Sequence, residues 1–300
     1  MIESPKMNDI PNLPKEFDDF IAPNADRRTI IRDYLAQRGV ETAVISLDGK
    51  NHIFVKFEKS AYSPLFKLKT VLCHYDRVET SPGANDNSAA CFQIMDWAVR
   101  LSRFRGVHNI RIFFTDGEEI AGHSSVKDQG AFALASLYRR LGITKDDVYV
   151  FDSCGRGNIA LISEKTLSHA MKGNLARLYE DLCKRTEQLL STVCPKRYFS
   201  LPMPYSDNAG FLACGIPAVV ITVLPANEVE QFARNLLENK NLKQSVLNPS
   251  ERDSSYKEKL PLTWQMFHTA ADTKENLTEE SFELMQSLLD ALALSKTISR

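Results

Sequence analysis

Residues 68–76 read LKTVLCHYD, an apolar run that ends directly in His74. Two further runs of the same kind follow along the chain, IRIFFT at residues 110–115 and DVYVF at residues 147–151. Short, almost continuous apolar runs are typical of strands buried in the middle of a sheet. We therefore expect these three runs to be neighbouring strands of one sheet, with the chemistry of the protein at the ends where they stop.

The segments between these runs have the spacing of amphipathic helices, and further strands are expected on either side. A hairpin is expected around the turn Asp48-Gly49. Helices are expected at about 26–38, 88–102, 130–141, 171–189, 208–214 and 277–294, and strands at 158–163 and 217–222. Strands that alternate with helices predict an α/β fold. The expected architecture is a three-layer α/β/α sandwich around a central mixed, mostly parallel sheet.

Composition and length describe an ordinary globular chain of 300 residues, 43% hydrophobic and 25% charged. Because the polar motifs spread from residue 74 to residue 268, one catalytic domain over residues 1–300 is expected. Residues 1–24 carry prolines and little periodicity, which indicates an N-terminal arm on the surface. Residues 240–262 are polar and aperiodic, which indicates a disordered loop or a flap over the site.

Charge and cysteine content exclude several classes of partner. The formal net charge is −1 with no basic block, so neither nucleic acid nor an anionic membrane surface is expected to bind. The N-terminus has no long apolar stretch, and no later segment approaches the length of a membrane span. The six cysteines contain no CxxC pair, which favours reduced, buried thiols and a cytoplasmic protein.

The three central strands all end in residues that bind metals. His74 ends the first, Glu118 and Glu119 follow the second, and Asp152 follows the third. The carboxyl ends of parallel strands form the edge where α/β sheets bind ligands. Unpaired buried carboxylates there would cost several kcal/mol unless a cation neutralised them. These residues therefore predict a metal centre, with Glu119 as a ligand and Glu118 as a general base for hydrolysis.

Two more candidate ligands and one supporting residue complete the pattern. Asp86 lies in GANDNSA among small residues, where its two oxygens can bridge two ions, and His268 lies in FHTAADT. Asp76 is two positions beyond His74, and we expect it to accept a hydrogen bond from the imidazole nitrogen that faces away from the metal. His123 is a reserve ligand because it is close to Glu119 in the sequence.

Together these motifs resemble the co-catalytic di-zinc aminopeptidases, whose wider superfamily includes glutaminyl cyclases and glutamate carboxypeptidases. The resemblance covers residues 68 to about 275. It implies two zinc ions bridged by Asp86, one completed by His74 and Glu119 and the other by Asp152 and His268. It also implies that Ser206, Asp207 and Asp272 support the ligands or contact the substrate.

The resulting hypothesis is a zinc-dependent aminopeptidase that acts on a peptide or a small aminoacyl compound. It would hydrolyse the N-terminal peptide bond with a metal-activated water, and Glu118 would be the base. A single-zinc glutaminyl cyclase is the close alternative, although such enzymes typically have Trp where this chain has Phe267. A catalytically inactive relative that serves as a binding module is the third possibility.

Overall fold

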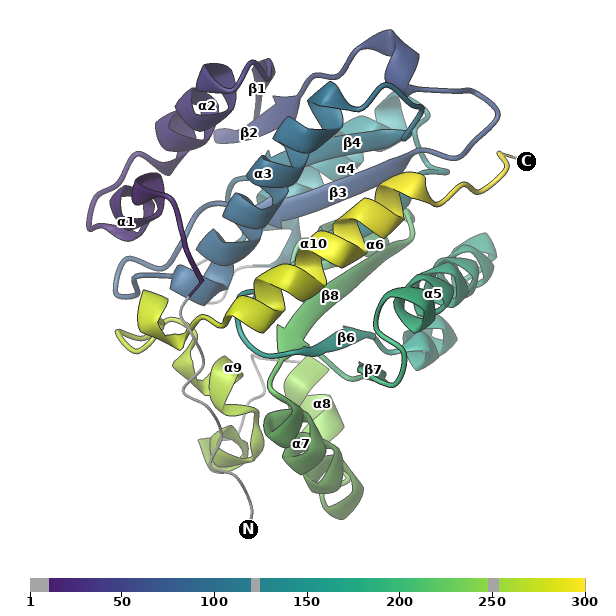
Figure 1. The fold of residues 1–300 in the computed structure, drawn as a ribbon. Coiled ribbons are helices and arrows are strands. Elements are labelled where there is room, and N and C mark those ends of the chain that lie inside the picture. The colour runs from purple at the N-terminus through teal and green to yellow at the C-terminus, as the bar shows by residue number, and fades with distance from the viewer. Residues whose placement is uncertain (1–10, 120–124, 248–253, 300) are drawn as a thin grey trace.

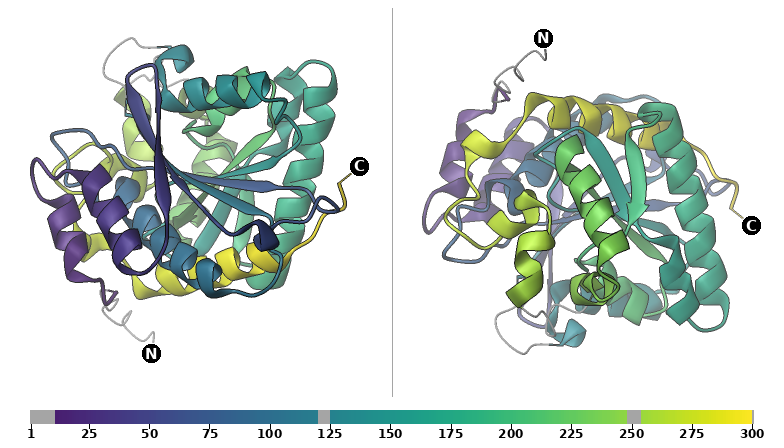
Figure 2. Two further views of the ribbon diagram at one scale, coloured as in Figure 1. Left: turned by 90° about the horizontal axis from the view of Figure 1, so that it is seen from above. Right: turned by 90° about the horizontal axis from the view of Figure 1, so that it is seen from below.

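The computed structural model describes residues 11–119, 125–247 and 254–299, which form an eight-stranded sheet between two layers of helices (Figures 1 and 2). The order of strands across the sheet is β1-β2-β4-β3-β5-β8-β6-β7. The strands are β1 Thr42–Leu47, β2 Lys50–Val55, β3 Lys69–His74, β4 Ile110–Thr115, β5 Asp147–Phe151, β6 Ile159–Ser163, β7 Tyr198–Leu201 and β8 Ala218–Leu224.

The centre of the sheet is parallel and its flanks bring in antiparallel pairs. β3 pairs in parallel with β4 and β5, and β5 pairs in parallel with β8. β1 and β2 form the expected hairpin, with Asp48 and Gly49 both at positive φ in its turn. β2 then joins β4, and β6 joins β8, in antiparallel register. The predicted mixed, mostly parallel α/β/α architecture is confirmed.

Two hydrophobic clusters fill the space between the sheet and the helical layers. Successive residues of a strand point to opposite faces, so Val71 and Cys73 of β3 join one cluster and Leu72 joins the other. One layer consists of α1 Lys15–Ile21, α2 Arg27–Gln37, α3 Ala89–Arg103, α5 Asn174–Val193 and α10 Glu279–Leu294. The other consists of α4 Gly130–Arg140, α6 Asn208–Ala213, α7 Ala226–Glu238, α8 Leu242–Leu247 and α9 Leu262–Met266.

The prediction of a surface arm over residues 1–24 is wrong for Lys15–Ile21, which form the helix α1. α1 buries Phe17 and Phe20 completely, and both rings contact Phe92 of α3 edge to face, with centroids 5.0 and 5.4 Å apart. The reason is the spacing of the two phenylalanines, which lie three residues apart and therefore on one side of a helix. Residues 1–10 lie outside the described part of the chain.

Of the two alternatives expected for residues 240–262, the disordered loop is wrong for the described part, and the flap over the site stays a prediction. Leu242 and Val246 of α8 are buried in the core, and a short 3₁₀ helix follows at Ser254–Lys259. Asn235 of α7 donates a hydrogen bond to the carbonyl of Lys259 at 2.8 Å, which fixes the end of this segment. Residues 248–253 are outside the described ranges. Among the described residues, no helix is both long and apolar enough to cross a membrane.

Candidate metal centre

The carboxyl ends of the central strands bring the predicted ligands together. His74 is the last residue of β3, Asp152 directly follows β5, and Glu119 lies in the turn after β4. Asp86 comes from the turn that leads into α3, and His268 follows α9. Because β4, β3 and β5 are adjacent and parallel, their ends meet at one edge of the sheet.

Two groups of possible ligands share the Asp86 carboxylate. His74 Nε2 lies 3.3 Å from Asp86 Oδ1 and 3.7 Å from Asp152 Oδ1. His268 Nε2 lies 3.5 Å from the other oxygen, Asp86 Oδ2, and 2.9 Å from Glu119 Oε2. Within each group of three residues, the possible ligand atoms all lie within 4.8 Å of one another. Asp86 therefore has the arrangement of a bridging carboxylate.

The groups around Asp86 favour a different pairing from the one implied by the resemblance. In them His74 stands with Asp152, and His268 stands with Glu119. A third group, without Asp86, brings His74 together with Glu118 and Glu119. The physical reason is the strand order. β3 is hydrogen-bonded to β5, so the residues that end these two strands share one side of Asp86, while the turn after β4 reaches towards His268.

Glu118 lies beside both imidazole and carboxylate groups without belonging to either group of three around Asp86. One of its oxygens is within 4.8 Å of possible ligand atoms of His74 and Glu119. Burial raises its pKa well above the usual carboxyl value, and the charges of Glu119 and Asp152 add to that effect, although His74 acts against it. A raised pKa makes a carboxylate a stronger proton acceptor, as a general base requires.

Asp76 has contacts beyond the predicted one with His74. Its carboxylate is 3.7 Å from His74 Nδ1, which faces the Asp76 backbone carbonyl at 3.3 Å instead. The carboxylate accepts hydrogen bonds from the backbone nitrogens of Glu118 and Glu119, at 3.2 and 2.9 Å. Burial works to raise the pKa of Asp76, but His74 and these two N–H groups outweigh it and lower the pKa. Asp76 is thus an anion that holds the turn after β4.

Asp272 holds the turn that carries Asp86. Its carboxylate oxygens accept the backbone N–H groups of Asn85 at 2.8 Å and Asp86 at 3.0 Å. Burial raises the pKa of Asp272 to about 6. The peptide bond between Asp86 and Asn87 is cis. The predicted supporting residue is therefore in direct contact with the backbone of the bridging ligand.

Ser206 and Asp207 lie behind the ligands, fully buried at the start of α6. Asp207 Oδ2 accepts a hydrogen bond from the hydroxyl of Thr115, the last residue of β4. Among the described residues, Asp207 Oδ1 and Ser206 Oγ have no hydrogen-bond partner. Burial raises the pKa of Asp207 to about 7. The structure brings both residues close to the centre, and it places neither among the groups of possible ligands.

The charges at this edge of the sheet fit a multivalent cation. Asp86, Glu118, Glu119 and Asp152 all line one cavity, and the imidazoles of His74 and His268 are grouped with them. Hydrogen bonds to Asp86 and Glu119 raise the pKa of His268 to about 10. For His74, burial favours the neutral ring, yet Asp152, Asp76 and Asp86 raise its pKa well above the usual value. Two imidazoles and three carboxylates are also the donor set that zinc accepts.

The backbone at two positions around the centre is strained. Ser153, directly after Asp152, has φ of 55°, and His268 has φ of 60°. A residue with a side chain in the left-handed region costs free energy, and such positions are concentrated at functional sites. At His268 this conformation presents the ring to Asp86 and Glu119, although its side chain is 54% exposed. His123 lies outside the described residues.

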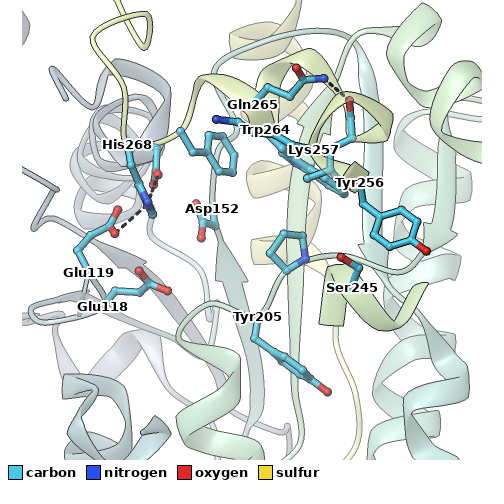
Figure 3. Close-up of a pocket in the computed structure, with 14 residues that line it drawn as sticks. Glu118, Glu119, Asp152, Tyr205, Ser245, Tyr256, Lys257, Trp264, Gln265 and His268 are labelled. Atoms are coloured by element: carbon cyan, nitrogen blue, oxygen red, sulfur yellow. Dashed lines mark hydrogen bonds and ion pairs between the residues drawn. The ribbon is translucent and has the colours of Figure 1, made fainter. Parts of the chain in front are cut away.

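A cavity of about 400 Å³ opens above these residues, and Figure 3 shows its walls. Carboxylates and His268 form one end of the cavity, and aromatic and apolar side chains form the rest, with one cation, Lys257. The members that sequence reasoning did not single out are Pro204, Tyr205, Ser245, Tyr256, Lys257, Leu260, Trp264 and Gln265. Four of these lie in the segment 240–262, and two more, Trp264 and Gln265, follow it closely. The short helices of this region were not predicted because its sequence lacks periodicity.

Comparison with solved structures gives relatives of two kinds. The aminopeptidase LapA of Legionella pneumophila is 14% identical, with a TM-score of 0.59 over 93% of this chain and 67% of that chain. The glutaminyl cyclase of Porphyromonas gingivalis is 14% identical, with a TM-score of 0.58 over 92% and 93%. The glutaminyl cyclase of Fimbriiglobus ruber is 14% identical, with a TM-score of 0.56 over 98% and 100%. At this identity the similarity shows the fold alone.

Among curated proteins, none matches the sequence. The sequence profile of peptidase family M28, in contrast, matches residues 54–293, which include every candidate ligand and the base. That match covers well over half of the 300 residues. The fold of the solved relatives and the convergence of the ligands at the sheet edge agree with it. The chain belongs to peptidase family M28.

Proposed function

We propose that this protein is an aminopeptidase with two zinc ions, which removes the N-terminal residue of a peptide. The observation that carries the proposal is the position of Asp86, whose two oxygens face two different imidazoles. His74 and Asp152 would complete one ion, and His268 and Glu119 the other. Bound zinc supplies Lewis acidity, which lowers the pKa of water and polarises a carbonyl group.

Glu118 is the proposed general base and later the general acid. Its carboxylate takes a proton from water as the water oxygen attacks the carbonyl carbon of the peptide bond. The same carboxyl group then gives that proton to the departing nitrogen as the C–N bond breaks, so the products are a free amino acid and a shortened peptide. Its raised pKa, caused by burial, supports both directions of transfer.

The shape and charge of the cavity support attack at the end of a chain. Its volume of about 400 Å³ suits a short peptide segment. The carboxylates at one end attract an α-ammonium group, and the aromatic walls of Trp264 and Phe267 suit an apolar side chain. Residues beyond the first would extend towards Lys257 and Tyr256, which line the same cavity.

A glutaminyl cyclase is the competing function, and the number of ions separates the two. A cyclase of the single-zinc type would use one group of three ligands and leave the other without a cation. Here both the group of His74, Asp86 and Asp152 and the group of Asp86, Glu119 and His268 have their possible ligand atoms within 4.8 Å of one another. Two such groups favour two ions and, with them, hydrolysis.

The experiment is mass spectrometry on peptides incubated with the zinc-loaded protein, with a chelated sample as the control. Half of the peptides begin with glutamine and half with other residues. Chelator-sensitive loss of single N-terminal residues supports the aminopeptidase. Ammonia loss confined to the glutamine peptides replaces it with the cyclase, and no change in either set rejects both activities on peptides.

The variant Glu118→Gln sharpens this test. It removes the base and keeps the shape of the side chain, so it should retain zinc and lose turnover. Glu280→Gln, on the exposed side of α10, is the matched control and should behave as the wild type. Turnover that survived in Glu118→Gln would show that another group is the base.

A further inference from the structure

Arg27, the first residue of α2, is a buried cation whose partners are neutral. The residue is only 5% exposed. Nε donates to the carbonyl of Phe20 at 3.0 Å, and the guanidinium stacks over the Phe20 ring at 4.6 Å. Within the described ranges it forms no ion pair with any carboxylate. Burial without a counter-ion lowers its pKa to about 10, which shows that desolvation of this charge is costly.

The other nitrogens of Arg27 bind the two loops that carry metal ligands. Nη1 donates to the carbonyl of Tyr75 at 3.1 Å, in the residue directly after His74. Nη2 donates to the carbonyl of Pro82 at 2.9 Å and to Ser88 Oγ at 3.0 Å. Pro82 and Ser88 bracket the turn with Asp86 at its centre. One rigid, planar group therefore joins the loop after β3 to the loop before α3.

The loop around Asp86 has little room to adjust if this group is lost. Ser88 Oγ in turn donates a hydrogen bond to the carbonyl of Gly83 at 2.5 Å. Gly83 has φ of 62°, and a Cβ atom there would lie 2.6 Å from the carbonyl oxygen of Asp86 and 3.2 Å from Arg27 Nη2. Asp272 holds the same turn from the opposite side through the N–H groups of Asn85 and Asp86.

A second arginine in the loop after β3 reaches back to the end of α1 and also to Pro82. Arg77 follows Asp76, and its Nη1 donates to the carbonyls of Ile21 at 2.7 Å and Pro82 at 3.0 Å. Its Nη2 donates to the carbonyl of Ala22 at 2.9 Å. Hydrogen bonds from Arg27 and Arg77 thus join the segment between α1 and α2 to the loops that carry the candidate ligands. The family match begins only at residue 54, so this link lies outside the segment that defines the family.

We propose that Arg27 is a positioning residue for the metal centre, so that the N-terminal helices α1 and α2 set the affinity of the site for zinc. The inference rests on the proposed zinc centre. Charge-assisted hydrogen bonds to both loops fix the backbones that carry His74 and Asp86 before any ion binds. Residues that orient ligands in this way typically change metal affinity by about 10- to 100-fold when they are replaced.

The test compares Arg27→Gln and Arg27→Lys with the control Arg38→Gln. Arg38 directly follows the last residue of α2. Its guanidinium stacks on the Tyr34 ring at 3.5 Å and forms an ion pair with Glu16 at 3.3 Å, and neither residue belongs to the loops with the candidate ligands. Two quantities are measured on each full-length protein: the zinc dissociation constant, by competition with a chromogenic chelator, and the thermal midpoint of the zinc-free form. The visible absorption of the cobalt-substituted protein reports ligand geometry independently.

The expected result is a loss of zinc affinity of tenfold or more in Arg27→Gln, a smaller loss in Arg27→Lys, and a changed cobalt spectrum in both. Arg38→Gln should bind zinc within about twofold of the wild type even where its thermal midpoint falls. Wild-type affinity in a folded Arg27 variant would overturn the proposal. If Arg27→Gln does not fold, Arg27→Lys and Ser88→Ala, which removes one acceptor, decide the matter by the same criterion. Failure of the wild type itself to bind zinc would reject the proposed function instead.

Discussion

Asp76 Oδ2 lies 2.9 Å from the backbone nitrogen of Glu119, so a carboxylate beside β3 holds the turn that follows β4. Its other oxygen receives the N–H group of Glu118 at 3.2 Å. Glu118, the proposed base, and Glu119, the candidate ligand beside it, are therefore held through their backbone nitrogens and not by their own rotamers alone. Asp76, which accepts both hydrogen bonds, is also two positions beyond His74 in the sequence.

Replacing this carboxylate should harm turnover more than metal binding. In Asp76→Asn the amide keeps one acceptor, but its NH₂ group faces one of the two backbone donors, so the turn with Glu118 shifts. We expect kcat to fall by about 10- to 100-fold while two zinc ions stay bound. Steady-state kinetics and elemental analysis measure both. Asp33→Asn, an exposed change on α2, is the control, and equal kcat values in the two variants would contradict this role.

The pairing of ligands around Asp86 can be tested by double substitution. His74→Ala and Asp152→Asn affect the same ion, so the double variant should still hold one zinc, as each single variant does. His74→Ala combined with Glu119→Gln affects both ions and should hold none. Zinc per chain after dialysis is the measurement. Loss of both ions from the first double variant would return the pairing to the one that the sequence resemblance implied.

Lys257 should tune the choice of peptide. It is exposed and lines the cavity in which the carboxylates occupy one end (Figure 3). In Lys257→Glu we expect kcat/KM to fall about two- to fivefold for peptides with an acidic second residue and to rise for basic ones. This range corresponds to a solvent-screened charge pair of roughly 0.4–1 kcal/mol. Lys127→Glu, at an exposed residue that does not line the cavity, is the control. An identical response to both peptide types would place Lys257 outside the substrate's reach.

Acid stability should depend on His108, which is fully buried. Burial lowers its pKa from 6.5 to about 4, and its Nδ1 accepts the N–H group of Ile110 at 3.0 Å. As the pH falls from 6.5 to 4, the unfolded chain gains a proton that the folded protein does not bind. Stability therefore falls in that window, by up to about 1.4 kcal/mol per pH unit from this group.

The comparison with His108→Asn isolates that contribution. Asparagine can accept the same N–H group and does not titrate. The free energy of unfolding of the wild type, measured by urea denaturation, should exceed that of the variant by less at pH 4.5 than at pH 7. A difference that is constant with pH would mean that folding does not shift the pKa of His108.

The central fold and the residues that meet at the edge of the sheet could be predicted because both depend on local patterns. Apolar runs such as IRIFFT identify buried strands, and a charged residue at the end of such a run identifies a site. The assignment of His74 and His268 to particular carboxylates could not be predicted in this way. It depends on which strand lies beside which, and that is a property of the assembled sheet.

The segments that were misjudged are short and lack a repeating period. α1 has two buried phenylalanines after Pro14, so its apolar residues cover a single helical turn. The apolar spacing that identifies a helix in a sequence has to continue over several turns. α8 and α9 have six and five residues, and tertiary packing of Val246 and Trp264 stabilises them. Arg27 could not be recognised either, because its partners are backbone carbonyls that the sequence does not distinguish.

The hairpin of β1 and β2 covers one side of β4. β2 pairs with β4 through Ile53 and Phe54, whose partners are Phe114 and Phe113. A chain shortened to the family segment 54–293 would lose β1 and most of β2, and β4 would become an open edge rich in phenylalanine. Such an edge is a template for intermolecular pairing, so the shortened chain should form aggregates where the full chain stays dispersed.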